Sequence, residues 1–141
     1  MFDIEHICDD ESALEKLSHE FSEHLRHGDV CLMTGEIGAG KTFFTTKLYE
    51  YLGGNPDLSG SPSFTIVNHY PLAEKDFYHV DLYRLDGVVE EDSIDQEEWM
   101  APNGYSFIEW AERMGEWRPE SGFLLSFKYH GEGRSVRIET I

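Results

Sequence analysis

Basic residues are scarce in this chain. Its 141 residues include 11 lysines and arginines against 28 aspartates and glutamates, which gives a formal net charge of −17 at pH 7. Nonspecific binding to nucleic acids depends on lysine and arginine displacing counterions, and binding to anionic membranes depends on basic clusters. The composition therefore argues against direct contact with either polyanion. The excess acid fits a solvated surface, a docking face for a basic partner, or adaptation to a salty cytoplasm.

Cysteines and long apolar runs are also few. Two cysteines, Cys8 and Cys31, are too few for a disulfide scaffold or a thiolate metal site, and both lie in apolar stretches typical of buried positions. No apolar run approaches the length of a membrane span. The first residues, "MFDIEHICDDE", lack the basic start and apolar centre of a signal peptide. We therefore expect a cytoplasmic protein with no membrane partner.

The length predicts a single domain, residues 1–141, with one hydrophobic core. Alternating or continuously apolar runs indicate strands, at 2–8, 30–35, 64–71, 76–85 and 105–110. The final stretch, 123–141, holds two alternating runs joined by a glycine-rich turn, which is typical of a β-hairpin.

Helices are expected between these strands. In residues 9–29 apolar side chains recur at helical spacing, Asp10 or Ser12 can cap the start, and Gly28 can end the helix. A second helix is expected at 41–53, and the acidic stretch 87–100 indicates a third. The element order predicts an α/β fold: a P-loop NTPase-like three-layer sandwich with a mostly parallel central sheet and an antiparallel C-terminal hairpin.

The most specific motif is "GEIGAGKT", residues 35–42, which satisfies the phosphate-binding pattern G-x-x-x-x-G-K-[ST]. Glycines let successive backbone N–H groups turn toward phosphate oxygens, and the helix that follows adds its positive end. In such loops the lysine reaches the β- and γ-phosphates and the hydroxyl residue binds Mg²⁺. The predicted nucleotide-binding residues here are Gly35, Glu36, Ile37, Gly38, Ala39, Gly40, Lys41, Thr42 and Phe43.

A P-loop enzyme also needs an acid near the phosphates, to hold Mg²⁺ or to orient water. Asp81 directly follows the apolar run "FYHV", and Glu109 follows "YSFI". Because α/β sheets bind ligands at the carboxyl ends of their strands, both acids are candidates for the site. With Lys41 they form the predicted catalytic set, and with Thr42 the predicted metal ligands.

Four motifs in order, "GEIGAGKT", "SPSFTIVNHY", "HVDLYRL" and "IEWAER", closely resemble the TsaE (YjeE) family of bacterial ATPases in tRNA threonylcarbamoyladenosine biosynthesis. The resemblance spans residues 12–113. It implies that Thr42 and Glu109 hold Mg²⁺ and that Asp81 lies near the reacting phosphate. It also implies a switch-like loop at "SPSFT", in which Ser63 replaces the usual threonine and keeps a hydroxyl for the γ-phosphate or Mg²⁺.

The resemblance further implies ATP and Mg²⁺ as ligands, and TsaD and TsaB as protein partners. In that family ATP hydrolysis supports turnover of the partner complex, so that contact with tRNA is indirect. Two other functions remain open on the residues alone: a small-molecule P-loop kinase, and a nucleotide-dependent switch with little hydrolysis. Only six arginines and no arginine-rich insert are present, which disfavours a kinase lid.

Three further side chains have alternative interpretations. His79 and Asp81 can face one side of a strand, but without other ligands a hydrogen-bonded structural histidine is favoured over a metal ligand. Trp110 is expected to anchor the core or an interface, or to pack near the site. Arg84 is expected to pair with neighbouring acids, with a phosphate contact as the alternative.

Overall fold

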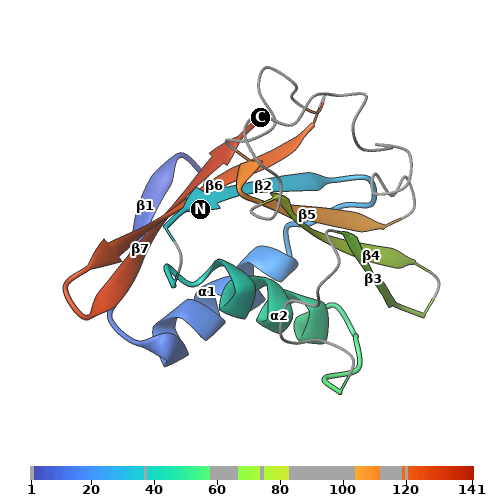
Figure 1. Ribbon diagram of the computed structural model, residues 1–141, viewed down its shortest axis with the longest axis horizontal. Coiled ribbons are helices and arrows are strands. Elements are labelled where there is room, and N and C mark those ends of the chain that lie inside the picture. The colour runs from blue at the N-terminus through green and yellow to red at the C-terminus, as the bar shows by residue number, and fades with distance from the viewer. Residues whose placement is uncertain are drawn as a thin grey trace.

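The computed structural model describes residues 2–36, 38–57, 67–73, 75–82, 104–111, 119 and 121–141. Within these ranges, seven strands form one mixed sheet, and two helices pack side by side against one face of it (Figure 1). The predicted α/β class is confirmed. The strands are β1 (Ile4–Cys8), β2 (Val30–Gly35), β3 (Val67–Pro71), β4 (Asp76–Asp81), β5 (Tyr105–Glu109), β6 (Gly122–His130) and β7 (Gly133–Thr140).

The centre of the sheet is parallel and its edges are antiparallel, as the sequence predicted. The strand order is β1-β7-β6-β2-β5-β4-β3. Strands β6, β2, β5 and β4 run in the same direction, whereas β7 and β1 on one edge and β3 on the other run against their neighbours. The carboxyl ends of four neighbouring strands therefore meet at one end of the sheet, where α/β proteins place their ligands.

Strand β2 has the burial pattern of a central strand in a parallel sheet. Its first four residues, "VCLM", are all buried, as expected for a strand covered on both faces. Cys31 and Met33 belong to the apolar core that includes the helices. Val30 and Leu32 belong to a second, smaller cluster that also contains Ile108. The alternation along one strand thus divides the apolar side chains between the two faces of the sheet.

Helix α1 (Glu11–Ser22) begins as expected but ends early. Asp10 is its N-cap and accepts a hydrogen bond from the Ala13 backbone N–H at 2.8 Å, which settles the choice between Asp10 and Ser12. The predicted end at Gly28 is wrong. The Asp29 carboxylate accepts the backbone N–H of Arg26 at 2.8 Å, so the chain turns toward β2 before it reaches Gly28.

Helix α2 (Lys41–Tyr51) follows the predicted second helix closely, and Gly53 after it has a left-handed φ of 102°. Both α1 and α2 lie on the same face of the sheet (Figure 1). The acidic helix predicted at 87–100 lies outside the described residues. Among the described helices, none is long and apolar enough to cross a membrane; the cytoplasmic location stays a prediction.

Candidate functional site

The phosphate-binding motif forms the turn between β2 and α2. Gly35 and Gly40 have φ values of 137° and 104°, which favour glycine. A Cβ at Gly35 would lie 2.4 Å from the backbone oxygen of Phe127, so this glycine also lets the loop lie against β6. The Glu36 carbonyl accepts the Ala39 N–H at 3.1 Å and closes the turn. Ile37 lies outside the described residues.

The start of α2 offers backbone donors to an anion. The first amides of a helix have no carbonyl partner within it, and the first intrahelical bond here runs from Phe44 N–H to the Gly40 carbonyl at 2.9 Å. The Phe43 side chain packs against the core, so its contribution to a phosphate site is its amide. Lys41, Thr42 and Phe43 therefore present N–H groups at the positive end of α2.

Lys41 is almost completely buried, with 4% of its surface exposed. Its Nζ donates a hydrogen bond to the Gly35 carbonyl and lies 3.6 Å from the ring centroid of Trp110. A buried ammonium group needs such partners to offset its lost hydration. The cation is thereby held at the first residue of the loop, next to the position that a phosphate would take.

Glu109, the last residue of β5, lies against the first turn of α2. The Thr42 hydroxyl is 3.2 Å from both carboxylate oxygens of Glu109. His79 hydrogen-bonds to the same carboxylate through Nε2. Both Glu109 and His79 are buried, so these contacts satisfy a carboxylate that would otherwise be costly to bury.

The role of His79 was predicted in general terms only. A hydrogen-bonded structural histidine was favoured, and the contact with Glu109 confirms the hydrogen bond. The partner is a predicted site residue, which spacing along the sequence could not identify because 30 positions separate the two residues. The pairing of β4 with β5 brings them together.

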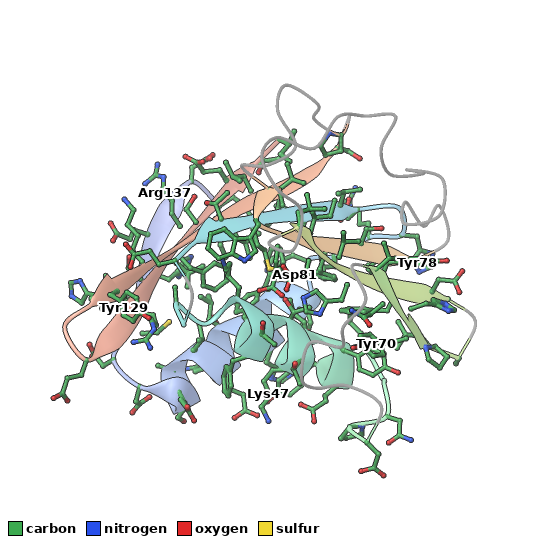
Figure 2. All side chains as sticks on the ribbon, in the orientation of Figure 1. Lys47, Tyr70, Tyr78, Asp81, Tyr129 and Arg137 are labelled. Atoms are coloured by element: carbon green, nitrogen blue, oxygen red, sulfur yellow. The ribbon has the colours of Figure 1, made fainter. Side chains whose placement is uncertain are left out.

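Asp81 ends β4 and is the register partner of Glu109 on β5. Because paired residues of neighbouring parallel strands project to the same face, the two predicted acids share one corner of the sheet. Asp81 is only partly buried, and Figure 2 shows it between the sheet and α2. The expectation that both acids meet the P-loop end of the sheet agrees with this register.

Trp110 follows Glu109 and has a φ of 62°, an unusual value for a bulky residue. The turn lets its ring cover the ammonium group of Lys41. Both interpretations of Trp110 therefore hold, since the residue packs against the smaller apolar cluster and against the Lys41 ammonium group. No pattern in the sequence indicated the backbone reversal.

An element distant in the sequence also reaches the loop. Arg134, at the start of β7, donates to the Gly38 carbonyl from Nε at 3.1 Å and from Nη2 at 2.9 Å. No local sequence pattern indicates this contact, because the two residues lie 96 positions apart. The contact could have been anticipated only by combining the predicted hairpin with the placement of β6 beside β2 in the sheet.

The oxygen ligands at this site suit Mg²⁺, which binds through a few carboxylate or hydroxyl oxygens together with waters and phosphates. Thr42 and Glu109 converge, and Asp81 lies on the adjacent strand. In the described part of the chain, no group of three or more histidine, cysteine, aspartate or glutamate side chains forms a self-sufficient metal site. Ser63 and Arg84 lie outside the described residues, so their predicted contacts stay predictions.

Comparison with known proteins identifies the family. Residues 8–137 match the family model described as threonylcarbamoyl adenosine biosynthesis protein TsaE. The TsaE proteins of Haemophilus influenzae and Bacillus subtilis are 28% and 33% identical to the chain, over 92% and 85% of it and 84% and 72% of their own lengths. The TsaE protein of Aquifex aeolicus is 34% identical over 76% of each chain.

A solved structure supports the same fold. The crystal structure of Bacillus subtilis YdiB superposes with a TM-score of 0.76 and covers 97% of this chain and 84% of its own, at 24% identity. The family match extends over the P-loop, both strand-end acids and most of the C-terminal hairpin. The chain therefore belongs to the TsaE family of threonylcarbamoyl adenosine biosynthesis proteins.

Proposed function

We propose that this chain binds ATP with Mg²⁺ at the P-loop and hydrolyses it in support of threonylcarbamoyladenosine modification of tRNA. The observation that carries the proposal is the convergence of Thr42 and Glu109 beside the buried Lys41. A P-loop site needs this combination of a hydroxyl, a carboxylate and a cation. The relatives in Haemophilus influenzae and Bacillus subtilis are both named tRNA threonylcarbamoyladenosine biosynthesis protein TsaE, which supports the pathway.

Binding depends on three groups of this chain. The amides of the loop and of the first turn of α2 receive the phosphate oxygens. Lys41 supplies a cation for the β- and γ-phosphates from its place beside Gly35. Thr42 and Glu109 hold Mg²⁺, which neutralises phosphate charge when it is bound. Since Lys41 and Glu109 are already buried and hydrogen-bonded, little reorganisation of these side chains is required.

Hydrolysis requires a residue that orients water at the γ-phosphate, and a carboxylate can take this role. Asp81 and Glu109 stand at register-paired positions, so one acid can ligate the metal while the other accepts a hydrogen bond from the water. His79 keeps the Glu109 carboxylate in place through its Nε2 contact. This division of tasks makes both acids necessary for turnover.

The proposed partners are the TsaB and TsaD subunits of the tRNA-modifying complex. A chain with a formal charge of −17 is poorly suited to hold tRNA itself. We propose that the partners bind the RNA and that ATP hydrolysis here resets their conformation after each cycle. Completion of a site by a partner also fits the low intrinsic rates of many P-loop proteins.

The test is phosphate release by the isolated chain and by the chain with TsaB–TsaD, followed by analysis of tRNA modification. We expect slow release alone, a marked increase with the complex, and multiple cycles of modification only with ATP. Nucleotide binding without phosphate release, even with the complex, would favour the nucleotide-dependent switch. Transfer of phosphate to a small molecule would favour the kinase.

A further inference from the structure

Arg134 links the C-terminal hairpin to the tip of the P-loop. Its Nε and Nη2 both donate to the Gly38 carbonyl, at 3.1 and 2.9 Å. The aliphatic part of the side chain also lies near the loop, because a Cβ added at Gly40 would be 3.9 Å from the Arg134 Cγ. One side chain of β7 thus hydrogen-bonds to one glycine of the loop and lies near a second.

Contacts within the β6–β7 hairpin hold the guanidinium group of Arg134 in place. Its Nη1 donates to the Gly133 carbonyl at 2.8 Å and to the Glu132 carbonyl at 3.3 Å. Its Cζ lies 4.4 Å from the ring centroid of Tyr129, the register partner of Arg134 on β6. Hydrogen bonds on one side and a cation–π contact on its face restrict the planar group to one orientation.

The contacted carbonyl matters because of the geometry of anion-binding loops. When successive N–H groups turn toward a phosphate, carbonyl groups between them must turn away and find donors elsewhere. Gly38 has a φ of 80°, and a Cβ there would lie 2.6 Å from the Tyr129 hydroxyl oxygen. The loop takes a left-handed turn at Gly38, where a side chain would clash with Tyr129, so glycine is required. Arg134 of the hairpin donates to the carbonyl of the same residue.

We propose that Arg134 is a positioning residue for nucleotide binding: it holds the Gly38 carbonyl outward so that the amides of the P-loop face the phosphates. The inference rests on the proposed function, since it concerns the same nucleotide site. Most donor groups of the guanidinium are engaged by Gly38, Glu132 and Gly133. Its role is therefore to shape the loop rather than to bind a phosphate directly.

The test compares ADP and AMP binding by isothermal titration calorimetry in the native protein, Arg134→Ala and Arg134→Lys. Hydrogen bonds to charged groups are among the stronger ones in proteins, and the exposure of both contacts to Gly38 limits the expected effect. We expect Arg134→Ala to weaken ADP about tenfold and to weaken AMP much less. AMP lacks the β-phosphate that P-loop amides surround, so the preference for ADP over AMP should fall.

Arg26→Ala is the matched control, because it removes the same charge from a position remote from the loop. Arg26 is exposed and lies in the turn before β2, at the opposite end of that strand from the P-loop. This control should bind ADP within about twofold of the native protein. Equal weakening by both alanine variants would mean that net charge, not positioning, sets the affinity, and would overturn the inference.

Two more outcomes separate the inference from the proposed function. If the native protein binds no ADP, the proposed function fails and the role of Arg134 fails with it. If the native protein binds ADP and Arg134→Ala keeps both its affinity and its preference over AMP, only the inference fails. Should Arg134→Ala unfold, Arg134→Lys decides, because it keeps the charge but not the two-pronged contact; native affinity in this variant would overturn the inference.

Discussion

The Thr42 hydroxyl lies 3.2 Å from each carboxylate oxygen of Glu109, although 67 positions separate the two residues in the sequence. One belongs to the first turn of α2 and the other ends β5, the strand beside β2. The contact joins the P-loop, at the start of α2, to the carboxyl end of β5. It also places a hydroxyl and a carboxylate where a single Mg²⁺ could be held by both.

Replacement of Glu109 by alanine should separate nucleotide binding from hydrolysis. The loop amides and Lys41 remain in Glu109→Ala, so we expect ATP affinity to stay within several-fold of the native value. Phosphate release with TsaB–TsaD should fall by roughly 100-fold or more, because a catalytic carboxylate is lost. A suitable control is Glu20→Ala, which removes an exposed carboxylate from α1. Native turnover in Glu109→Ala would exclude Glu109 from the reaction.

Asp81 should be equally necessary for turnover. It is paired with Glu109 in the register of β4 and β5, and its loss should leave ATP bound but slow phosphate release by about 100-fold. Asp76→Ala is the matched control, because Asp76 begins the same strand and pairs with His69 at 2.7 Å at the far end. Similar turnover in both variants, measured with the partner complex, would remove Asp81 from the site.

Lys41→Ala should abolish nucleotide binding. The ammonium group is buried between the Gly35 carbonyl and the Trp110 ring, and its loss removes the cation that the β- and γ-phosphates need. Lys47→Ala on the same helix is the control, since Lys47 forms ion pairs with Glu15 and Glu50. Calorimetry with ATP should detect no binding to Lys41→Ala and native binding to Lys47→Ala. Unchanged ATP affinity in Lys41→Ala would contradict the site.

Much of this site could be predicted from the sequence because its parts are local. The P-loop is one continuous segment, and an acid that directly follows an apolar strand must lie at the carboxyl end of a parallel sheet. Lys41, Thr42, Asp81 and Glu109 were predicted as site residues on these grounds. The hairpin β6–β7 was equally predictable, because two alternating runs joined by a glycine-rich turn favour one arrangement.

The remaining contacts depend on strand order, which local patterns do not encode. His79 meets Glu109 because β4 pairs with β5, and Arg134 meets Gly38 because the hairpin packs beside β2. Beyond the end of α1 at Ser22, the Asp29 side chain accepts the backbone N–H of Arg26 in place of a helical carbonyl. Helical spacing alone continued through this segment and gave the wrong boundary.

Direct binding of tRNA by the isolated chain should be negligible. The formal charge of −17 opposes a polyanion, because few lysines and arginines are available to displace counterions. A gel-shift titration to micromolar protein at low salt should show no complex, whereas addition of TsaB–TsaD should produce one. A salt-dependent shift by the chain alone would contradict the indirect role assigned to it.

The thiol of Cys31 should stay protonated and unreactive in the folded protein. It is completely buried, and burial, with a smaller effect of Asp29, raises its pKa well above the ordinary value. A thiol reagent at pH 8 should therefore modify Cys31 only after unfolding.

The same shift makes stability depend on pH in a defined direction. Below the thiol pKa of the unfolded chain, about 8.5, both states are protonated and Cys31 contributes no pH dependence. At higher pH the unfolded thiol ionises while the buried thiol does not, so the free energy of unfolding falls by up to about 1.4 kcal/mol per pH unit. Urea titrations at pH 8 and pH 10 should show this loss in the native protein and a smaller loss in Cys31→Ala. Equal losses in the two proteins would mean that other groups, not the buried thiol, govern stability at alkaline pH.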